Sequence, residues 1–339
     1  MSNPILVEVI RGGVLESFHR GVICVVDREG KVILEEGDIR QVCYPRSALK
    51  FFQQIPLLMS GAVEAFGFTE EELAVTCGSH NGEERHVNAV DSILRKIGLD
   101  RSALQCGAQY PTHRKTANEL IAKGIKPEAI HNNCSGKHAG FLALAIYKGL
   151  STHDYLESNH PVQSEIKSLV ADFHDMPLHA LHGALDGCSA PIFAIPVYHQ
   201  ALAYMRLVNP DFGDTRLRNA CDTLVRVAHE HPFMIAGTGR YCTDLMEHCG
   251  AELIGKTGAE GIYSLAFHQL GIGACIKIDD GKMLPQYHVA QKLVAQSGLF
   301  EPAQLAPLHH YLEAPIVNFS KNVTGSIRVS DAILKHPWR

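Results

Sequence analysis

The sequence predicts an α+β fold in which N-terminal and C-terminal strands share one antiparallel sheet, with a large helical insert between them. Short Val- and Ile-rich runs bounded by turn residues fill residues 5–36. From roughly residue 45 to residue 250, apolar residues recur at the spacing typical of helices, and strand patterns return after Lys256. Helices packed on the sheet would bury its apolar face. Because the chain has no repeat, low-complexity tract or linker, we predict a single domain over residues 1–339.

The individual elements follow from local patterns. Alternating or continuous β-branched runs flanked by turn residues predict strands at 21–26, 31–35, 262–270 and 273–278. Apolar residues recurring every three to four positions predict helices at 60–65, 83–97, 138–147, 161–173, 216–229 and 284–297. The apolar run 72–78 ends in glycine and leads into a tight turn that presents polar groups.

Composition is that of an ordinary globular protein, with 46% hydrophobic and 20% charged residues. The formal charge of −5 argues against nucleic acid or an anionic membrane as the main partner. No run is long enough to span a membrane, and the first residues lack a secretory signal, which favours a cytoplasmic enzyme. Ten cysteines without a regular framework indicate reduced thiols.

Ser47 and Lys50 form a Ser-x-x-Lys motif. Pro45 suits the first position of a helix, which would place Ser47 in the first turn and Lys50 on the same face. A lysine acts as a base only when its amine is neutral, and a helix N-terminus, apolar neighbours and a second cation, for which Lys256 is the candidate, all favour the neutral form. Backbone amides near Ser47 are candidates for an oxyanion hole.

Two further motifs follow in order, Ser79-His80-Asn81 and Lys256-Thr257-Gly258. The set Ser-x-x-Lys, Ser-x-Asn and Lys-Thr-Gly is typical of serine hydrolases of the penicillin-binding type, which act through an acyl-enzyme. Each motif alone has an ordinary interpretation as a helix cap or a hairpin lysine. A second Ser-x-x-Lys at residues 164–167 lacks the companion motifs.

Longer segments resemble the rhizobial-type L-asparaginases of the asparaginase II family. The segments are residues 11–21, 45–50, 77–83, 133–138, 186–191 and 255–261. The resemblance implies hydrolysis of L-asparagine to L-aspartate and ammonia, a fold like that of serine β-lactamases and penicillin-binding proteins, and a homodimer. It also implies two Ser-Lys pairs, Ser47 with Lys50 and Ser79 with Lys256. The motif spacings of 79 − 47 = 32 and 256 − 79 = 177 residues differ from those of β-lactamases.

The resemblance further implies a zinc ion, Zn2+, held by Cys134, Lys137 and Cys188. Two thiolates suit zinc, whereas a lysine amine must lose its proton to bind it. Cys134 and Lys137 share one face of a predicted helix, and Asp186 is placed to order the metal or its water. From the residues alone, both cysteines also fit the description of small buried apolar side chains.

We expect Ser47 to be the nucleophile and Lys50 its base, with Ser79 and Lys256 completing a proton relay or positioning the substrate. The sequence leaves open which serine attacks. Candidates for holding the substrate are Arg46, His80, Asn81, Thr257 and Gly258. Two alternatives remain open: a glutamine-directed or penicillin-recognising serine hydrolase, and a non-enzymatic zinc-stabilised binding protein.

Overall fold

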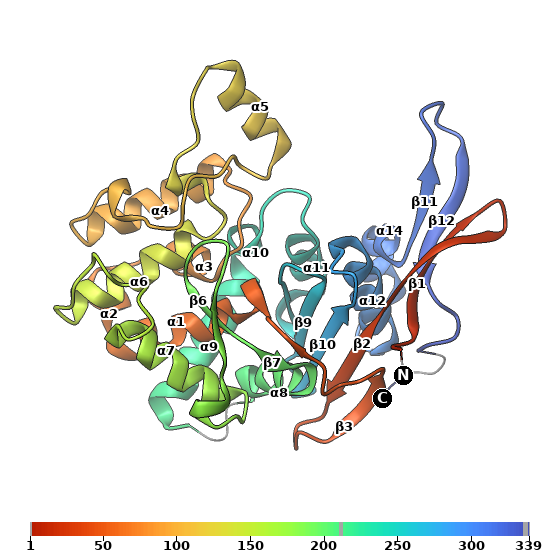
Figure 1. Cartoon of the computed structure of the whole chain (residues 1–339), viewed down its shortest axis with the longest axis horizontal. Helices are drawn as coiled ribbons and strands as arrows, with labels where there is room; N and C mark the ends of the chain where they lie inside the picture. The colour runs from red at the N-terminus through yellow and green to blue at the C-terminus, as the bar shows by residue number, and fades with distance from the viewer. Residues whose placement is uncertain (1, 210–212, 335–337, 339) are drawn as a thin grey trace. The chain divides into compact units, whose positions relative to one another are not determined.

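The computed structural model describes residues 2–209, 213–334 and 338, which fall into two compact units (Figure 1). The sheet unit comprises Met1–Ala48, Ile195–Asn209 and Glu247–Arg339. The helical unit comprises Leu49–Ala194 and Pro210–Met246. The insert predicted at 45–250 is therefore largely the helical unit, except that 195–209 returns to the sheet unit. The assignment of residues 1–339 to one domain stays a prediction.

The sheet unit is built on an eight-stranded antiparallel sheet in the order β11-β12-β1-β2-β10-β9-β8, with β3 beside β2. Its strands are β1 (Ile5–Arg11), β2 (Val14–Val26), β3 (Val32–Glu36), β8 (Leu253–Thr257), β9 (Ile262–Phe267), β10 (Ile272–Ile278), β11 (Glu313–Val317) and β12 (Val323–Val329). Red N-terminal strands lie beside blue C-terminal strands in Figure 1. This order confirms the predicted α+β class with one sheet shared by the two ends of the chain.

The core of the sheet unit lies between the sheet and α8 (Val197–Val208). Val22, Cys24 and Val26 point from β2 into this core, where they meet Ala201 and Met205 of α8. Burying side chains of this size contributes about 1.5–3 kcal/mol each relative to exposure.

The remaining elements of the sheet unit include β4 (Val42–Cys43), β7 (Ile195–Pro196), α12 (Met283–Gln296), α13 (Pro302–Leu305) and α14 (His309–Leu312).

The helical unit is organised around α1 (Lys50–Ser60), which packs against α6, α7 and α9. The other elements are α2 (Ala62–Ala65), α3 (Glu70–Cys77), α4 (Glu84–Lys96), α5 (Arg114–Ala122), α6 (Ser135–Tyr147), α7 (Pro161–Phe173), β5 (Gly183–Leu185), β6 (Pro191–Phe193), α9 (Thr215–Glu230) and α10 (Pro232–Ile235). Helix α11 (Tyr241–Cys249) crosses the boundary between the units. Gly136 lets α6 approach α3 closely, because a Cβ there would lie 2.2 Å from the Val75 carbonyl oxygen.

Several predicted elements are confirmed within one or two residues, namely those at 83–97, 161–173, 216–229, 273–278 and 284–297. The helix predicted at 60–65 is wrong, because Gly61 adopts φ +86° and separates α1 from α2. The run 72–78 belongs mainly to helix α3, which Thr69 caps reciprocally with Glu72. The strand predicted at 262–270 ends at Phe267, and the helix predicted from 138 begins at Ser135.

Among the described residues, no helix combines the length and apolar character needed to cross a bilayer.

Candidate active site

Ser47 lies in a single 3-10 turn, Arg46–Leu49, which leads directly into α1 at Lys50. Arg46 adopts φ +53°, a left-handed conformation that costs a non-glycine residue on the order of 1 kcal/mol. The prediction that the helix begins at Pro45 is therefore wrong, since this kink delays its start. The Ala48 amide donates to the Pro45 carbonyl at 3.0 Å, so it is not available for an oxyanion hole. Local backbone strain of this kind is characteristic of functional turns.

The Lys-Thr-Gly motif lies at the end of β8, the edge strand of the sheet. Lys256 is fully buried, which is rare for lysine. Thr257 accepts a hydrogen bond from Gln286 Nε2 at 2.7 Å, which fixes its hydroxyl. A Cβ on Gly258 would lie 2.3 Å from the Pro45 carbonyl oxygen, so the motif lies directly against the turn that carries Ser47.

Lys50 begins α1 and is fully buried in the helical unit. Its Nζ donates hydrogen bonds to the backbone carbonyls of Gly78 and Asn133, the latter at 3.1 Å. Gly78 directly precedes Ser79, and Asn133 directly precedes Cys134. The lysine of the first motif therefore holds the backbone that enters both the second motif and the cysteine cluster.

The turn Ser79–Asn81 is buried, and its backbone is anchored by the Ser79 amide, which donates to the Ile235 carbonyl at 2.8 Å. His80 Nδ1 accepts from the Gly82 amide at 3.1 Å, so the ring proton lies on Nε2, which donates to Ser135 Oγ at 3.0 Å. Both ring nitrogens are thus used within the protein. The geometry favours a positioning role for this side chain, and the substrate contact expected from His80 stays a prediction.

Asn81 is held by a loop that the sequence analysis did not single out. Its Nδ2 donates to the Thr238 carbonyl at 2.9 Å, while its Oδ1 accepts from Thr112 Oγ1 at 3.0 Å and from Arg240 Nη1 at 2.9 Å. Arg240 is thereby a neighbour of the second motif. The only sequence signal for this loop is the pair of glycines that flanks Thr238.

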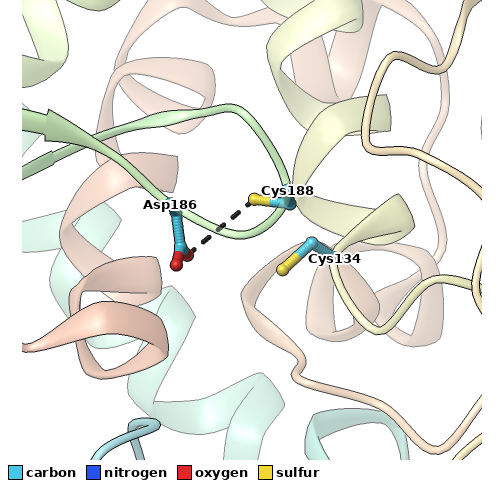
Figure 2. A group of neighbouring side chains, drawn as sticks. All are labelled: Cys134, Asp186 and Cys188. Atoms are coloured by element: carbon cyan, nitrogen blue, oxygen red, sulfur yellow. Dashed lines mark hydrogen bonds between the residues drawn. The ribbon is translucent and has the colours of Figure 1, made fainter.

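The cysteine cluster joins the start of α6 to the turn between β5 and β6 (Figure 2). Ligand atoms of Cys134, Cys188 and Asp186 all lie within 4.8 Å of one another, and the three side chains point toward a common centre. Cys188 Sγ lies 3.8 Å from Asp186 Oδ2, and Lys137 Nζ donates to Cys188 Sγ at 3.2 Å. The structure thus brings together all four residues predicted to bind the metal.

The charges of this cluster depend on one another. The pKa of Cys134 is lowered well below its ordinary value, first by the hydrogen bond from the Cys188 thiol and further by the nearby Lys137 cation, which act against burial. Burial alone would lower the pKa of Lys137, but the negative charge shared by the Cys188–Cys134 pair and the charge of Asp186 raise it. Two sulfur donors, a carboxylate and an amine at such proximity fit a zinc ion, whose charge would favour loss of the lysine proton.

The predicted residues therefore fall into two groups. The sheet unit brings together Arg46, Ser47, Lys256, Thr257 and Gly258. The helical unit brings together Lys50, Ser79, His80, Asn81, Cys134, Lys137, Asp186 and Cys188. Ser47 and Lys50 are three residues apart in one continuous helical run, so the chain itself joins the groups.

Comparison with known proteins places the chain in a family. It is similar to a β-lactamase from Mycobacterium bovis (12% identity, 86% of this chain and 94% of that chain, TM-score 0.41). It is also similar to simvastatin synthase from Aspergillus terreus (12% identity, 76% of this chain and 86% of that chain, TM-score 0.39). No curated protein sequence matches significantly. The family model of L-asparaginase II, however, matches residues 7–329. The chain therefore belongs to the L-asparaginase II family of amidohydrolases.

Proposed function

We propose that the protein is an L-asparaginase that hydrolyses L-asparagine to L-aspartate and ammonia by Ser-Lys nucleophilic catalysis. The observation that carries this proposal is the burial of Lys50 immediately after the Ser47 turn, in a chain of the L-asparaginase II family. A buried lysine amine that directly follows a serine turn and contacts backbone carbonyls fits the general base of a Ser-Lys pair.

In this mechanism the Ser47 hydroxyl attacks the carbon of the side-chain amide while the Lys50 amine accepts its proton. Ammonia leaves with that proton, and an ester between Ser47 and the aspartyl side chain remains. Water then cleaves the ester and releases L-aspartate. Ser79 and Lys256 relay protons or position the substrate, and Arg46, Asn81, Thr257 and Gly258 contribute to holding it.

The hydrogen bonds of Lys50 are compatible with a base. A neutral lysine amine has two N–H donors and one lone pair. The carbonyls of Gly78 and Asn133 can accept both donors, which leaves the lone pair for a proton. The two contacts therefore do not require the charged form.

We further propose that Cys134, Lys137, Cys188 and Asp186 hold a zinc ion. When bound, zinc supplies a fixed positive charge that orients the polar groups of the substrate. The sulfur-rich donor set supports this assignment, because zinc binds thiolates. The pKa of Cys134 is lowered, whereas its hydrogen bond with Cys134 and burial raise the pKa of Cys188, whose proton the charge of a zinc ion would help to remove.

Ammonia release from L-asparagine, measured beside L-glutamine and a chromogenic β-lactam, tests the proposal. We expect L-asparagine to be hydrolysed fastest. Preferential turnover of glutamine or of the β-lactam would favour the alternative hydrolases. A folded protein that binds zinc but releases no ammonia from either amide would favour the non-enzymatic binding protein.

We also propose a homodimer in the cytoplasm. Support comes from apolar side chains exposed at the ends of the paired hairpins β1–β2 and β11–β12, including Val14 (67% exposed), Phe319 (106%) and Val323 (68%). All ten cysteines are free thiols in the structure, which suits a reducing compartment. Light scattering should give twice the monomer mass of 37.2 kDa, and Phe319→Ser with Val323→Ser should weaken the dimer.

A further inference from the structure

Arg240 forms no ion pair with an acidic side chain among the described residues. Its Nη1 donates to Asn81 Oδ1 at 2.9 Å and approaches the Ser79 carbonyl oxygen at 3.5 Å. Within the part of the chain that the structure describes, its Nε and Nη2 form no hydrogen bond or ion pair, although the side chain is half-buried. Other arginines are paired with carboxylates: Arg11 with Glu16, Arg85 with Glu71, Arg101 with Asp91 and Arg226 with Glu70.

The loop that carries Arg240 is fixed against the Ser79–Asn81 turn. Gly237 has φ +110°, and a Cβ there would lie 2.6 Å from Glu83 Oε1 and 2.9 Å from Asn81 Cβ. Thr238 donates to the Glu83 carboxylate through its amide and its hydroxyl, both at 2.8 Å. The guanidinium is therefore held at a defined position, so an incoming ligand would order little further chain.

The orientation of the contact leaves one edge of the guanidinium unused. Asn81 Nδ2 donates to the Thr238 carbonyl, which turns Oδ1 toward Arg240 as an acceptor. This bond occupies Nη1, whereas Nε and Nη2 form the edge that pairs with both oxygens of a carboxylate. A half-buried cation with a neutral partner gains more from an anionic ligand than an exposed arginine does.

We propose that Arg240 binds the α-carboxylate of the substrate through its Nε and Nη2. The assignment of this carboxylate rests on the proposed function, because an amino-acid amide carries that one anionic group. Arg240 is then a substrate-binding residue that distinguishes amino-acid amides from simple amides. Its loop contacts the Ser79–Asn81 turn directly, so the anchor of the substrate would lie beside the serine that relays protons or positions the substrate.

Steady-state kinetics with L-asparagine and its α-methyl ester test this role, since ammonia from either substrate comes only from the side-chain amide. Arg240→Gln should raise the KM for L-asparagine about 10- to 100-fold with kcat nearly unchanged. The same variant should leave the KM for the ester as in the wild type, and Arg240→Lys should restore part of the affinity for L-asparagine. Arg95→Gln, which removes an exposed arginine of α4, is the matched control and should change nothing.

Equal losses with both substrates, or a fall in kcat at constant KM, would overturn the proposal and make Arg240 a structural clamp. Calorimetric binding of L-aspartate separates this outcome from failure of the proposed function. One possible result is that L-asparagine is not hydrolysed while L-aspartate binds the wild type but not Arg240→Gln. That result would support the carboxylate site at Arg240 and contradict the proposed asparaginase activity. A wild type that neither turns over L-asparagine nor binds L-aspartate would overturn both.

Discussion

Lys50 Nζ lies 3.1 Å from the carbonyl oxygen of Asn133. The residue after Asn133 is Cys134, and the second acceptor of Lys50 is the carbonyl of Gly78, the residue before Ser79. One side chain therefore stabilises the backbone on which both Ser79 and Cys134 depend. Substitution at position 50 should affect stability as well as chemistry, whereas substitution of Ser47 should affect chemistry alone.

Ser47→Ala and Lys50→Met should each abolish ammonia release, because the first removes the nucleophile and the second its base. Lys50→Met should also lower the free energy of unfolding by about 1–3 kcal/mol, since two buried carbonyls lose their donor. Urea unfolding beside the ammonia assay separates the two effects. The two losses of activity should be strongly non-additive in the double variant.

The other Ser-x-x-Lys of the chain provides the control. Ser164 is exposed and Lys167 half-buried, on α7, so Ser164→Ala and Lys167→Met should leave activity and unfolding unchanged. If Ser47→Ala retained near wild-type turnover while Ser79→Ala did not, the roles of the two serines would have to be exchanged.

The rate should depend on pH as a lysine base requires. Activity at saturating L-asparagine should rise through neutral into alkaline pH, because the attacking serine needs a neutral amine as proton acceptor. Measuring kcat from pH 6 to pH 10 checks this expectation. A flat profile over that range would contradict a lysine base.

Most of the fold and much of the candidate site could be predicted from local patterns. The strand at 273–278 and the helix at 161–173 follow clear sequence patterns, and both lie within one residue of the predicted bounds. Ser47 shows the limit of such reasoning. Pro45 is a good helix starter, yet the left-handed φ of Arg46 delays the helix, and no propensity predicts a strained arginine.

Arg240 shows a second limit. It lies 159 residues from the Asn81 side chain to which it donates, and its loop has neither helical nor strand periodicity. Contacts of this kind are set by tertiary packing, here by the close approach of Gly237 to Asn81. The residue types alone do not reveal which of many arginines lies beside Asn81.

Stability should fall as the pH drops from about 6.5 toward 4. Burial lowers the pKa of His86 to about 4, against 6.5 in the unfolded chain, and burial also lowers the pKa of His138. Between these values the unfolded chain binds a proton that the native state does not, so protonation favours unfolding by on the order of 2–3 kcal/mol for His86. His86→Phe, which retains the aromatic stack on Phe233, should give a shallower dependence of unfolding free energy on pH.

The control for this effect is His153→Gln, which replaces an exposed histidine. Urea unfolding at pH 4.5, 5.5 and 7 gives the unfolding free energy of each protein as a function of pH. If the unfolding free energies of the wild type and His86→Phe fell in parallel over this range, the lowered pKa of His86 would be contradicted.

Purified protein should carry about one zinc per chain, and Cys134→Ala or Cys188→Ala should lose it, because each removes one of two sulfur ligands. Cys221→Ala, which alters a buried cysteine of α9 outside the cluster, should retain the metal. Since Ser47, Lys50, Ser79 and Lys256 already supply the nucleophile and the bases, loss of zinc should raise KM more than it lowers kcat. Elemental analysis of the wild type and the three variants, paired with steady-state kinetics, shows whether the metal orients the substrate, takes part in the chemical step or is not needed for activity. Full activity without bound metal would make the cysteines structural, and a collapse of kcat at constant KM would place zinc in the chemical step.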